Sequence, residues 1–349
     1  MKKIAALALL VGTAASVSAQ SSVTLFGVVD LGVRHTENGN RSVSSMSTGG
    51  LSSSRFGVRG TEDMGGGLVA GFWLESGINA DTGSQNDSNR LFSRRSTVSL
   101  SSAMGELRLG RDTTPTYTVV SNFDVFNANG VAEADKFFDR LGTNVDTNKR
   151  ADNMVSYFLP SNLGGVYGSA SVAAGEGSTG TNGGKKYMGG RLGYKVGALD
   201  LTAAYGETEV ARIVVNEDKY KVATFGASYD LGMVKLTGYV SENKYAAQKV
   251  NAYHIGGSVP VGLGSFRAGY TKVNAKGIVN GVNINNNDAD QFAIGYIHNL
   301  SKRTALYATM ARVNNDGAAG YLVDSNPALV GTNSGRSSTG YEVGVRHSF

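Results

Sequence analysis

Residues 23–34 read Val-Thr-Leu-Phe-Gly-Val-Val-Asp-Leu-Gly-Val-Arg and set the pattern for most of the chain. The odd positions are apolar, whereas the even positions carry Thr24, Asp30 and Arg34. Alternation with a period of two indicates a β-strand with one apolar and one polar face. The same alternation returns near residues 199–205, 265–271 and 341–346. The sequence therefore predicts an all-β chain made of two-faced strands.

Turn-forming residues divide these strands unevenly. Seven short connections alternate with eight long polar stretches, which predicts sixteen strands. An even number of antiparallel strands, with short turns at one end and long loops at the other, is typical of a transmembrane β-barrel. The short connections are 61–67, 102–105, 159–165, 196–198, 230–232, 260–264 and 298–303. The long stretches are 35–50, 79–91, 112–149, 175–185, 207–218, 242–249, 274–288 and 314–337.

The first nineteen residues have a different character. Lys2 and Lys3 precede an apolar run, Ile4–Val11, and small residues continue to Ala19. A charged start, an apolar middle and a small-residue end are the features of a removable secretory signal. We therefore expect a signal peptide at 1–19 and a mature barrel domain at 20–349; a buried N-terminal helix is the alternative.

The composition supports an exported barrel. The chain has no cysteine, so disulfides and thiolate metal sites do not stabilise it. No apolar run of about 18 residues follows position 20, so within a membrane only a closed barrel would satisfy the backbone. Pro115 and Pro327 fall in long stretches, and Pro160 and Pro260 fall in short turns, so none interrupts a predicted strand. A soluble sandwich would also alternate, but it would lack the uneven turns.

Several motifs resemble a known family. The ending Tyr-Glu-Val-Gly-Val-Arg-His-Ser-Phe, residues 341–349, is similar to the C-terminal signature of outer-membrane barrels, although His347 stands where that signature has an apolar or aromatic residue. Residues 22–30, 54–63, 105–111 and 150–157 resemble, in order, strands of the general porins, particularly the anion-selective type of β-proteobacteria. The resemblance implies a trimeric sixteen-stranded barrel in the outer membrane of a Gram-negative bacterium. The third long loop would fold inside each barrel and narrow a water-filled pore.

That third loop, 112–149, also stands out without the resemblance. It is the longest connection, and a long loop in a compact protein is usually functional. Its aromatic residues would pack inside the barrel while its carboxylates face the lumen; a surface loop that binds partners is the alternative. The aromatic residues are Tyr117, Phe123, Phe126, Phe137 and Phe138, and the acidic ones include Asp124, Glu133 and Asp135.

Five arginines are candidates for the wall opposite this loop. Alternation directs Arg55, Arg59 and Arg150 inward. The family's constriction carries an arginine cluster, which the resemblance places on Arg55, Arg94 and Arg150. Alternation against Val98 and Leu100 would turn Arg95 inward instead of Arg94, so we keep Arg94 first and Arg95 in reserve. Exposed rim residues in surface ion pairs are the alternative for each arginine.

These features predict a passive channel for small hydrophilic solutes and ions. Arginine stays charged at every relevant pH, and basic rings favour anions. In a neck narrower than the screening length of about 8–10 Å, salt does not remove their field. The expected partners are small anions and solutes, outer-membrane lipid, lipopolysaccharide and two further copies of the chain. A substrate-specific channel, a receptor or adhesion barrel, and a plugged structural anchor are the alternatives.

Other functional classes find no support. The four histidines are scattered and form no H-E-x-x-H pair, so the sequence predicts neither an enzyme nor a metal site, and no cofactor. Basic residues are spread over many strands instead of being clustered, which argues against nucleic-acid binding.

Overall fold

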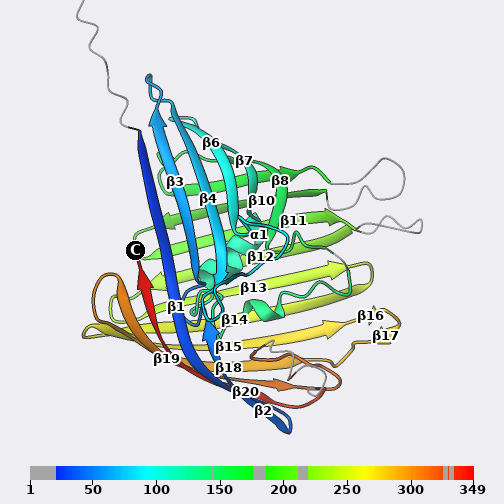
Figure 1. Ribbon diagram of the computed structural model, residues 1–349. Helices are drawn as coiled ribbons and strands as arrows, with labels where there is room; N and C mark the ends of the chain where they lie inside the picture. Colours follow the sequence, from blue (N-terminus) through cyan, green and yellow to red (C-terminus); the bar gives the residue numbers. More distant parts are fainter. Residues whose placement is uncertain (1–20, 144, 176–185, 211–218, 325–328, 330–333) are drawn as a thin grey trace, which may run out of the picture.

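The protein is described by a computed structural model that covers residues 21–143, 145–175, 186–210, 219–324, 329 and 334–349. The predicted signal peptide, 1–19, lies outside these described residues. Within them the chain forms a closed ring of antiparallel strands, shown in Figure 1. No helix among the described residues is long and apolar enough to cross a membrane.

Sixteen long strands make up the ring in the described part of the chain, which confirms the predicted number and fold class. Each strand pairs with its neighbours in the chain, and β1 (Ser22–Asn38) closes the ring against β20 (Ser338–Ser348). The others are β3 (Arg55–Asp63), β4 (Val69–Asn79), β6 (Arg95–Ser102), β7 (Gly105–Thr113), β8 (Arg150–Phe158), β9 (Val166–Ala173), β10 (Tyr187–Val196), β11 (Leu199–Glu209), β12 (Lys219–Asp230), β13 (Lys235–Tyr245), β14 (Gln248–Val261), β15 (Gly264–Lys276), β18 (Ala289–Asn299) and β19 (Thr304–Asn315).

Closure of the ring depends on β1, which has two sets of partners. Its first residues, Ser22–Val28, pair with β3, whereas Val28–Asn38 pair with β20. Phe349 extends the seam, because its backbone N–H and C=O both bond to Gly27 at 3.1 Å. Figure 1 shows the C-terminus beside β1. A closed ring leaves no unpaired strand edge, which lipid would not tolerate.

Two stretches predicted as long loops are mostly strand, which corrects the sequence analysis. In 35–50, β1 continues to Asn38 and β2 (Arg41–Thr48) pairs back on it. In 242–249, β13 and β14 are joined by only two residues, 246 and 247. Both hairpins are polar on both faces, so alternation does not reveal them. Three short strands complete the loops: β5 (Ser84–Gln85), β16 (Ile278–Val279) and β17 (Val282–Asn283).

Pro260 also departs from expectation, because it lies inside β14 and not in the turn. It pairs with Ser265 of β15, but it lies beyond Ser258, the last residue of β14 that pairs with β13. The missing N–H therefore removes no bond from the β13 side of the ladder, where proline is tolerated.

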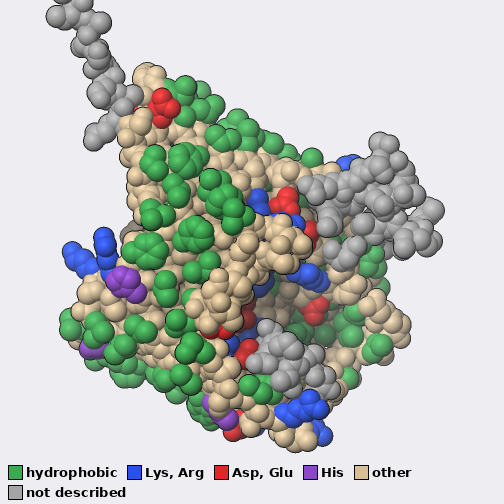
Figure 2. Space-filling view, in the orientation of Figure 1, with side chains coloured by type: hydrophobic (Ala, Val, Ile, Leu, Met, Phe, Trp, Pro, Cys, Tyr) green, Lys and Arg blue, Asp and Glu red, His purple; other side chains and the backbone are tan. Residues whose placement is uncertain are grey.

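The two faces of the strands differ as predicted. On β1, Val23 and Leu25 are exposed on the outer surface, whereas Asp30 of the opposite face is fully buried. Figure 2 shows hydrophobic side chains over the outer face of the strands, and charged side chains gathered in the hollow between them. A hydrophobic outer face suits lipid, and a polar inner face suits water.

The loop 112–149 folds inside the ring, which confirms its predicted place. It contains α1 (Pro115–Phe123) and the short 3-10 helix η1 (Asp135–Phe137), and Figure 1 shows α1 within the ring of strands. Pro115 opens α1, where its missing N–H breaks no helical bond. The main hydrophobic core joins the loop to the inner wall. It includes Val119, Phe123, Phe126, Val131, Phe137 and Leu141 of the loop and Ala204, Val222, Tyr239, Val250, Val273 and Ala293 of the wall.

Glycines on the wall make room for the loop. A Cβ on Gly226 of β12 would lie 2.6 Å from the Phe123 ring, and one on Gly256 of β14 would lie 2.6 Å from Val125. Gly295 of β18 similarly faces Phe126. Real Cβ atoms do not approach as closely as 2.6 Å, so any other residue at Gly226 or Gly256 would force the loop to shift, whereas the 3.1 Å contact at Gly295 is tight but less severe.

The neighbouring glycines Gly256 and Gly257 allow a direct test of this packing. They lie on opposite faces of β14, and a Cβ on Gly257 would meet nothing closer than 3.4 Å. Gly256→Ala should destabilise the folded barrel by about 1–3 kcal/mol, the usual effect of overpacking, and raise single-channel conductance by displacing the loop. Gly257→Ala should change neither property. Equal behaviour of the two variants in thermal unfolding and planar-bilayer recordings would contradict this account.

Candidate pore constriction

The inner wall holds the loop with hydrogen bonds to its backbone. Thr237 donates to the carbonyl of Phe123 at 3.0 Å, and Gln291 donates to that of Ala132 at 2.8 Å. Further donors are Tyr239 to Ala134, Tyr220 and Asn243 to Asp139, and Gln248 to Leu141. Because these bonds come from four strands, β12, β13, β14 and β18, the loop is fixed along much of its length.

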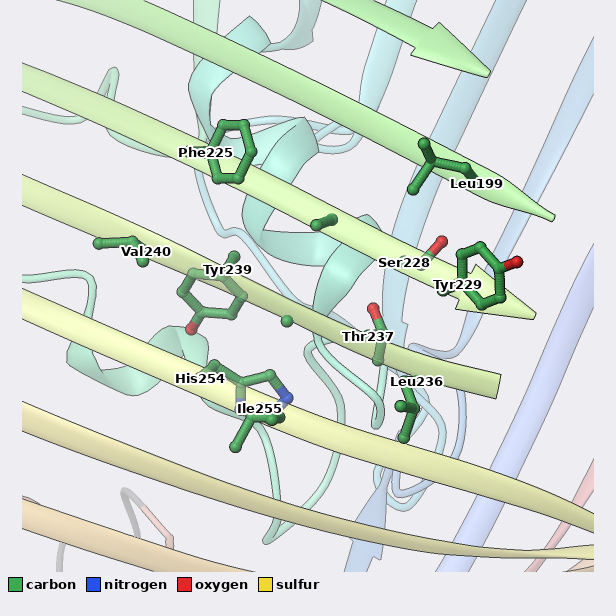
Figure 3. A pocket seen from close by; sticks show the side chains of 12 residues that line it. Leu199, Phe225, Ser228, Tyr229, Leu236, Thr237, Tyr239, Val240, His254 and Ile255 are labelled. Carbon is green, nitrogen blue, oxygen red and sulfur yellow. The ribbon is translucent and has the colours of Figure 1, made fainter. Parts of the chain in front are cut away.

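Figure 3 shows this part of the wall, where alternate residues serve opposite faces. Leu199, Phe225, Leu236, Val240 and Ile255 line an apolar hollow of about 360 Å³ on the outside. Thr237, Tyr239 and His254 lie between them in the sequence and contact the loop. His254 accepts a hydrogen bond from the backbone N–H of Val125 at 3.3 Å and stacks on Tyr239, with the ring centroids 5.3 Å apart.

Five arginines line one cavity of about 470 Å³ on the other side of the lumen. They are Arg55, Arg59, Arg94, Arg95 and Arg150, which are all five of the arginines predicted from the sequence. The same cavity is lined by Trp73, Glu75 and Asp112. Residues from five separate strand regions therefore meet at one level of the barrel.

Glu75 of β4 connects two of these arginines. Its Oε1 lies 2.5 Å from Nε of Arg94 and 3.5 Å from Nε of Arg55, and its side chain is only 8% exposed. Arg150 donates from Nε to the backbone carbonyl of Arg94 at 3.1 Å. Arg55, Arg94 and Arg150 thus form one connected group, with a single carboxylate between the first two.

The register resolves the conflict between Arg94 and Arg95. Arg95 pairs with Glu75 in the ladder and so shares the face of Trp73 and Thr97. Arg94 precedes β6, outside the ladder, and its backbone N–H bonds to the carbonyl of Glu75 at 3.1 Å. Alternation does not apply to a residue outside the strand, so both arginines reach the cavity.

The three predicted acids do not face this cavity, which corrects the expected arrangement. Asp124 is 1% exposed, and its carboxylate accepts the backbone N–H groups of Phe126, Ala128 and Ala134. It therefore shapes the loop itself. Asp135 is also buried, where its Oδ2 accepts Tyr117 at 2.6 Å and Lys149 at 2.5 Å.

Glu133 is the most open of the three acids, but it lines a different cavity. This polar cavity of about 240 Å³ also has Arg34, Asn129 and Asp324 in its wall. Arg34 is already paired with Glu342 and, at 3.4 Å, with Asp324. The loop therefore presents fewer free carboxylates than its composition indicates.

Sequence reasoning missed several lumen residues. Trp73 and Glu75 lie in the run Gly71-Phe-Trp-Leu-Glu-Ser, where large apolar residues on both faces hide the alternation. Arg108 was also missed; it lies 2.6 Å from Asp112, one of the acids expected to face the lumen, and extends the charged wall along β7. Arg267 of β15 and Arg346 of β20 are close enough for their charges to interact, and Arg346 also interacts with Arg55. The alternation of apolar and polar residues places Arg267 and Arg346 on the inward face of their strands, and this is the signal that could have identified them.

Comparison with known proteins agrees with this architecture. A family model described as Gram-negative porin matches residues 6–318. The chain is 40% identical over 363 residues to outer membrane porin protein 32 of Delftia acidovorans, covering 100% of this chain and 99% of that protein. The chain belongs to the Gram-negative porin family. Membership confirms that it is an outer-membrane channel for passive diffusion and not an enzyme.

Solved structures resemble the porin closely. An anion-selective porin from Comamonas acidovorans has a TM-score of 0.84 and 38% identity, covering 95% of this chain and 100% of that one. OmpT of Vibrio cholerae, in its trimer form, has a TM-score of 0.64 at 16% identity and covers 94% and 99% of the two chains. At that identity the second likeness shows the barrel fold alone.

The charged groups of the loop predict a pH dependence. Removal from water inside the barrel, with Asp135 nearby, raises the pKa of Glu133 to about 8, and burial lowers the pKa of Lys136 to about 8. As pH rises from 7 to 9, Glu133 gains a negative charge and Lys136 loses a positive one. Both changes make the lumen more negative, so anion permeability relative to cation permeability should fall, by up to about five-fold for a charge 4 Å from the ion path.

Reversal potentials in a salt gradient at the two pH values would measure this change. Glu133→Gln removes one of the two titrating groups. The anion-to-cation permeability ratio of this variant should therefore fall less between pH 7 and 9 than that of the unmodified protein. A permeability ratio that is constant from pH 7 to 9 would rule out titration of the loop.

Proposed function

We propose that this porin is anion-preferring and that Arg55, Arg59, Arg94, Arg95 and Arg150 form its selective constriction. The charge balance of their cavity is the observation that carries the proposal. Five arginines face the side-chain carboxylates of Glu75 and Asp112 and the terminal carboxylate of Phe349, which leaves 5 − 3 = +2. Such a surplus attracts mobile anions and repels cations, because arginine remains charged at all relevant pH values.

The loop supports the same sign of selectivity. Asp124 and Asp135 are occupied by bonds within the loop, so neither balances the arginines across the lumen. The anion-selective porin from Comamonas acidovorans aligns with nearly the whole chain. Small inorganic anions and small hydrophilic solutes are the cargo that this proposal implies.

The proposal also includes export of the chain and its insertion into the outer membrane. Residues 1–19 would direct export and then be removed, leaving 20–349 as the barrel. Outer-membrane lipid and lipopolysaccharide would surround it, since large apolar residues such as Phe266, Phe292 and Leu306 are exposed on the outer face.

Neutralising the connected arginines tests the constriction. The triple variant Arg55→Gln, Arg94→Gln, Arg150→Gln should lower the anion-to-cation permeability ratio by roughly five-fold or more, since one charge at 4 Å in water is worth about that factor. The matched control removes three positive charges from exposed positions at the short-turn end: Lys195→Gln, Lys302→Gln, Arg303→Gln.

Reversal potentials of both variants in planar bilayers decide the outcome. A ratio that changes in the first variant and not in the control supports the assignment. Equal ratios in both variants would show that the three arginines do not govern ion passage. Conductance that saturates with one solute would indicate a substrate-specific channel instead of a general one.

We further propose that the porin is a homotrimer whose interface includes the outer face of β1 and β3. Val23, Leu25, Val29 and Phe56 are exposed there, and they carry no charge. Leu31 and Val58 lie on the same two strands with the same parity. An uncharged apolar face with few aromatic anchors suits contact with another protein surface.

Cysteine cross-linking tests the interface, because the chain has no native cysteine. Leu25→Cys should give covalent oligomers with a short bifunctional thiol reagent in outer-membrane vesicles. Ile294→Cys, which is exposed on β18, should remain monomeric on denaturing gels. Cross-linking of the second variant but not the first would place the interface on another side of the barrel.

A further inference from the structure

We propose that Trp73 is the positioning residue of the constriction and that it holds the arginines in place through its ring and its N–H group. This inference rests on the anion preference proposed above. Trp73 is the only tryptophan in the chain, and it lines the arginine cavity from the middle of β4. A neutral residue would then control charge selectivity.

The ring supports two guanidinium groups. The guanidinium carbon of Arg59 lies 4.9 Å from the ring centroid of Trp73, and that of Arg95 lies 4.6 Å from it. Both distances fall within the range of about 6 Å in which a cation is attracted to an aromatic face. Tryptophan offers the most favourable face of any side chain for this contact.

The N–H group reaches two further arginines through Glu75. Nε1 of Trp73 donates to Oε2 of Glu75 at 2.9 Å. The other oxygen of Glu75, Oε1, lies 2.5 Å from Nε of Arg94 and 3.5 Å from Nε of Arg55. Trp73 therefore contacts Arg59 and Arg95 directly and is linked to Arg55 and Arg94 through the carboxylate of Glu75.

The strand register explains why the Trp73 ring contacts arginines on both neighbouring strands, β3 and β6. Trp73 pairs with Arg59 on β3 and with Thr97 on β6, while Arg95 pairs with the next inward residue of β4, Glu75. Phe26 of β1 supports the ring in an edge-to-face contact, with centroids 5.0 Å apart and planes at 62°. The ring is thus fixed by a neighbour that is itself part of the closing strand.

Arg59 depends most on the ring. Among the described residues it makes no ion pair, and its guanidinium carbon lies 4.9 Å from the ring centroid of Trp73 and 5.3 Å from that of Phe26. Arg95 has two further contacts, because its Nε donates to Oγ1 of Thr97 at 3.0 Å and lies 3.7 Å from Oδ2 of Asp112. Without the Trp73 ring, Arg59 would keep only the contact with Phe26. Arg95 would keep only its contacts with Thr97 and Asp112, and the carboxylate of Asp112 opposes its charge.

Trp73→Leu is the main test, because it leaves every charge in the chain unchanged. We expect the anion-to-cation permeability ratio of the reconstituted trimer to fall by about two- to five-fold, the factor that corresponds to one exposed cation–π contact. Trp73→Phe keeps an aromatic face but loses the N–H group, so its ratio should lie between those of the unmodified protein and Trp73→Leu. Side-chain size falls in the same order, so an effect of a wider lumen alone is recognised by a rise in single-channel conductance, which loss of the arginine contacts does not require.

Tyr167→Leu is the matched control. Tyr167 also lies under an arginine, Arg191, at 5.2 Å, but neither residue lines the arginine cavity. The control removes a similar ring from the lumen, and its permeability ratio should equal that of the unmodified protein.

Fluorescence gives an independent measurement, since all tryptophan emission comes from Trp73. Iodide, an anionic quencher, should quench the folded protein at least about two-fold more efficiently than caesium, relative to the same ratio in the unfolded chain. The double variant Arg59→Gln, Arg95→Gln should lose this excess. An iodide-to-caesium quenching ratio that is the same in the folded and unfolded states would overturn the placement of these arginines against the ring.

The two measurements separate this inference from the proposed function. If the unmodified porin is anion-selective and Trp73→Leu keeps its ratio while trimers form, the positioning role is wrong and the proposed function stands. If the unmodified porin shows no anion preference, the proposed function fails, and the quenching ratio still decides whether Trp73 holds the arginines.

Discussion

The closed backbone ladder is the constraint on which the rest of the structure depends. A strand edge exposed to lipid would leave N–H and C=O groups without partners, and each such group is costly in hydrocarbon. The pairing of β1 with both β3 and β20 removes that edge, and the backbone bonds between Gly27 and Phe349 complete it. Because the ladder supplies the stability, the inner face is free to carry residues that would be unfavourable in an ordinary hydrophobic core.

Two parts of the inner face have different roles: one packs against the loop, and the other carries the charged residues. On β12 to β18, small residues and glycines receive the loop, so that apolar side chains such as Phe123 and Phe126 fill one side of the lumen. On β3 to β8, the wall carries the arginine cavity. Apart from Asp112 and Thr113 at its start, the loop does not line that cavity. Arg55, Arg59, Arg95 and Arg150 lie on strands, and Arg94 directly precedes one.

Local patterns explain which features the sequence could predict. Alternation and turn residues act within a few positions, and they located the sixteen strands and the seven short turns. Alternation also predicted an inward direction for Arg55, Arg59 and Arg150, whereas Arg94, which precedes β6, came from the family resemblance. Hairpins that are polar on both faces, as in 35–50 and 242–249, do not alternate and were taken for loops. The burial of Asp124 inside the loop could not be predicted, because the three backbone N–H groups that bind its carboxylate come together only after folding. Trp73 was missed because its neighbours on both faces are large.

Like charges at close range are stable only when something fixes their separation. Arg55 and Arg94 share Glu75, Arg150 bonds to the carbonyl of Arg94, and Arg59 and Arg95 lie against Trp73. A carboxylate for each arginine would neutralise the field, whereas no support at all would let the long side chains spread apart. Aromatic faces and carbonyl groups hold a guanidinium without cancelling its charge. The cavity therefore keeps both its order and its surplus of positive charge, which is what a selective passage for anions requires.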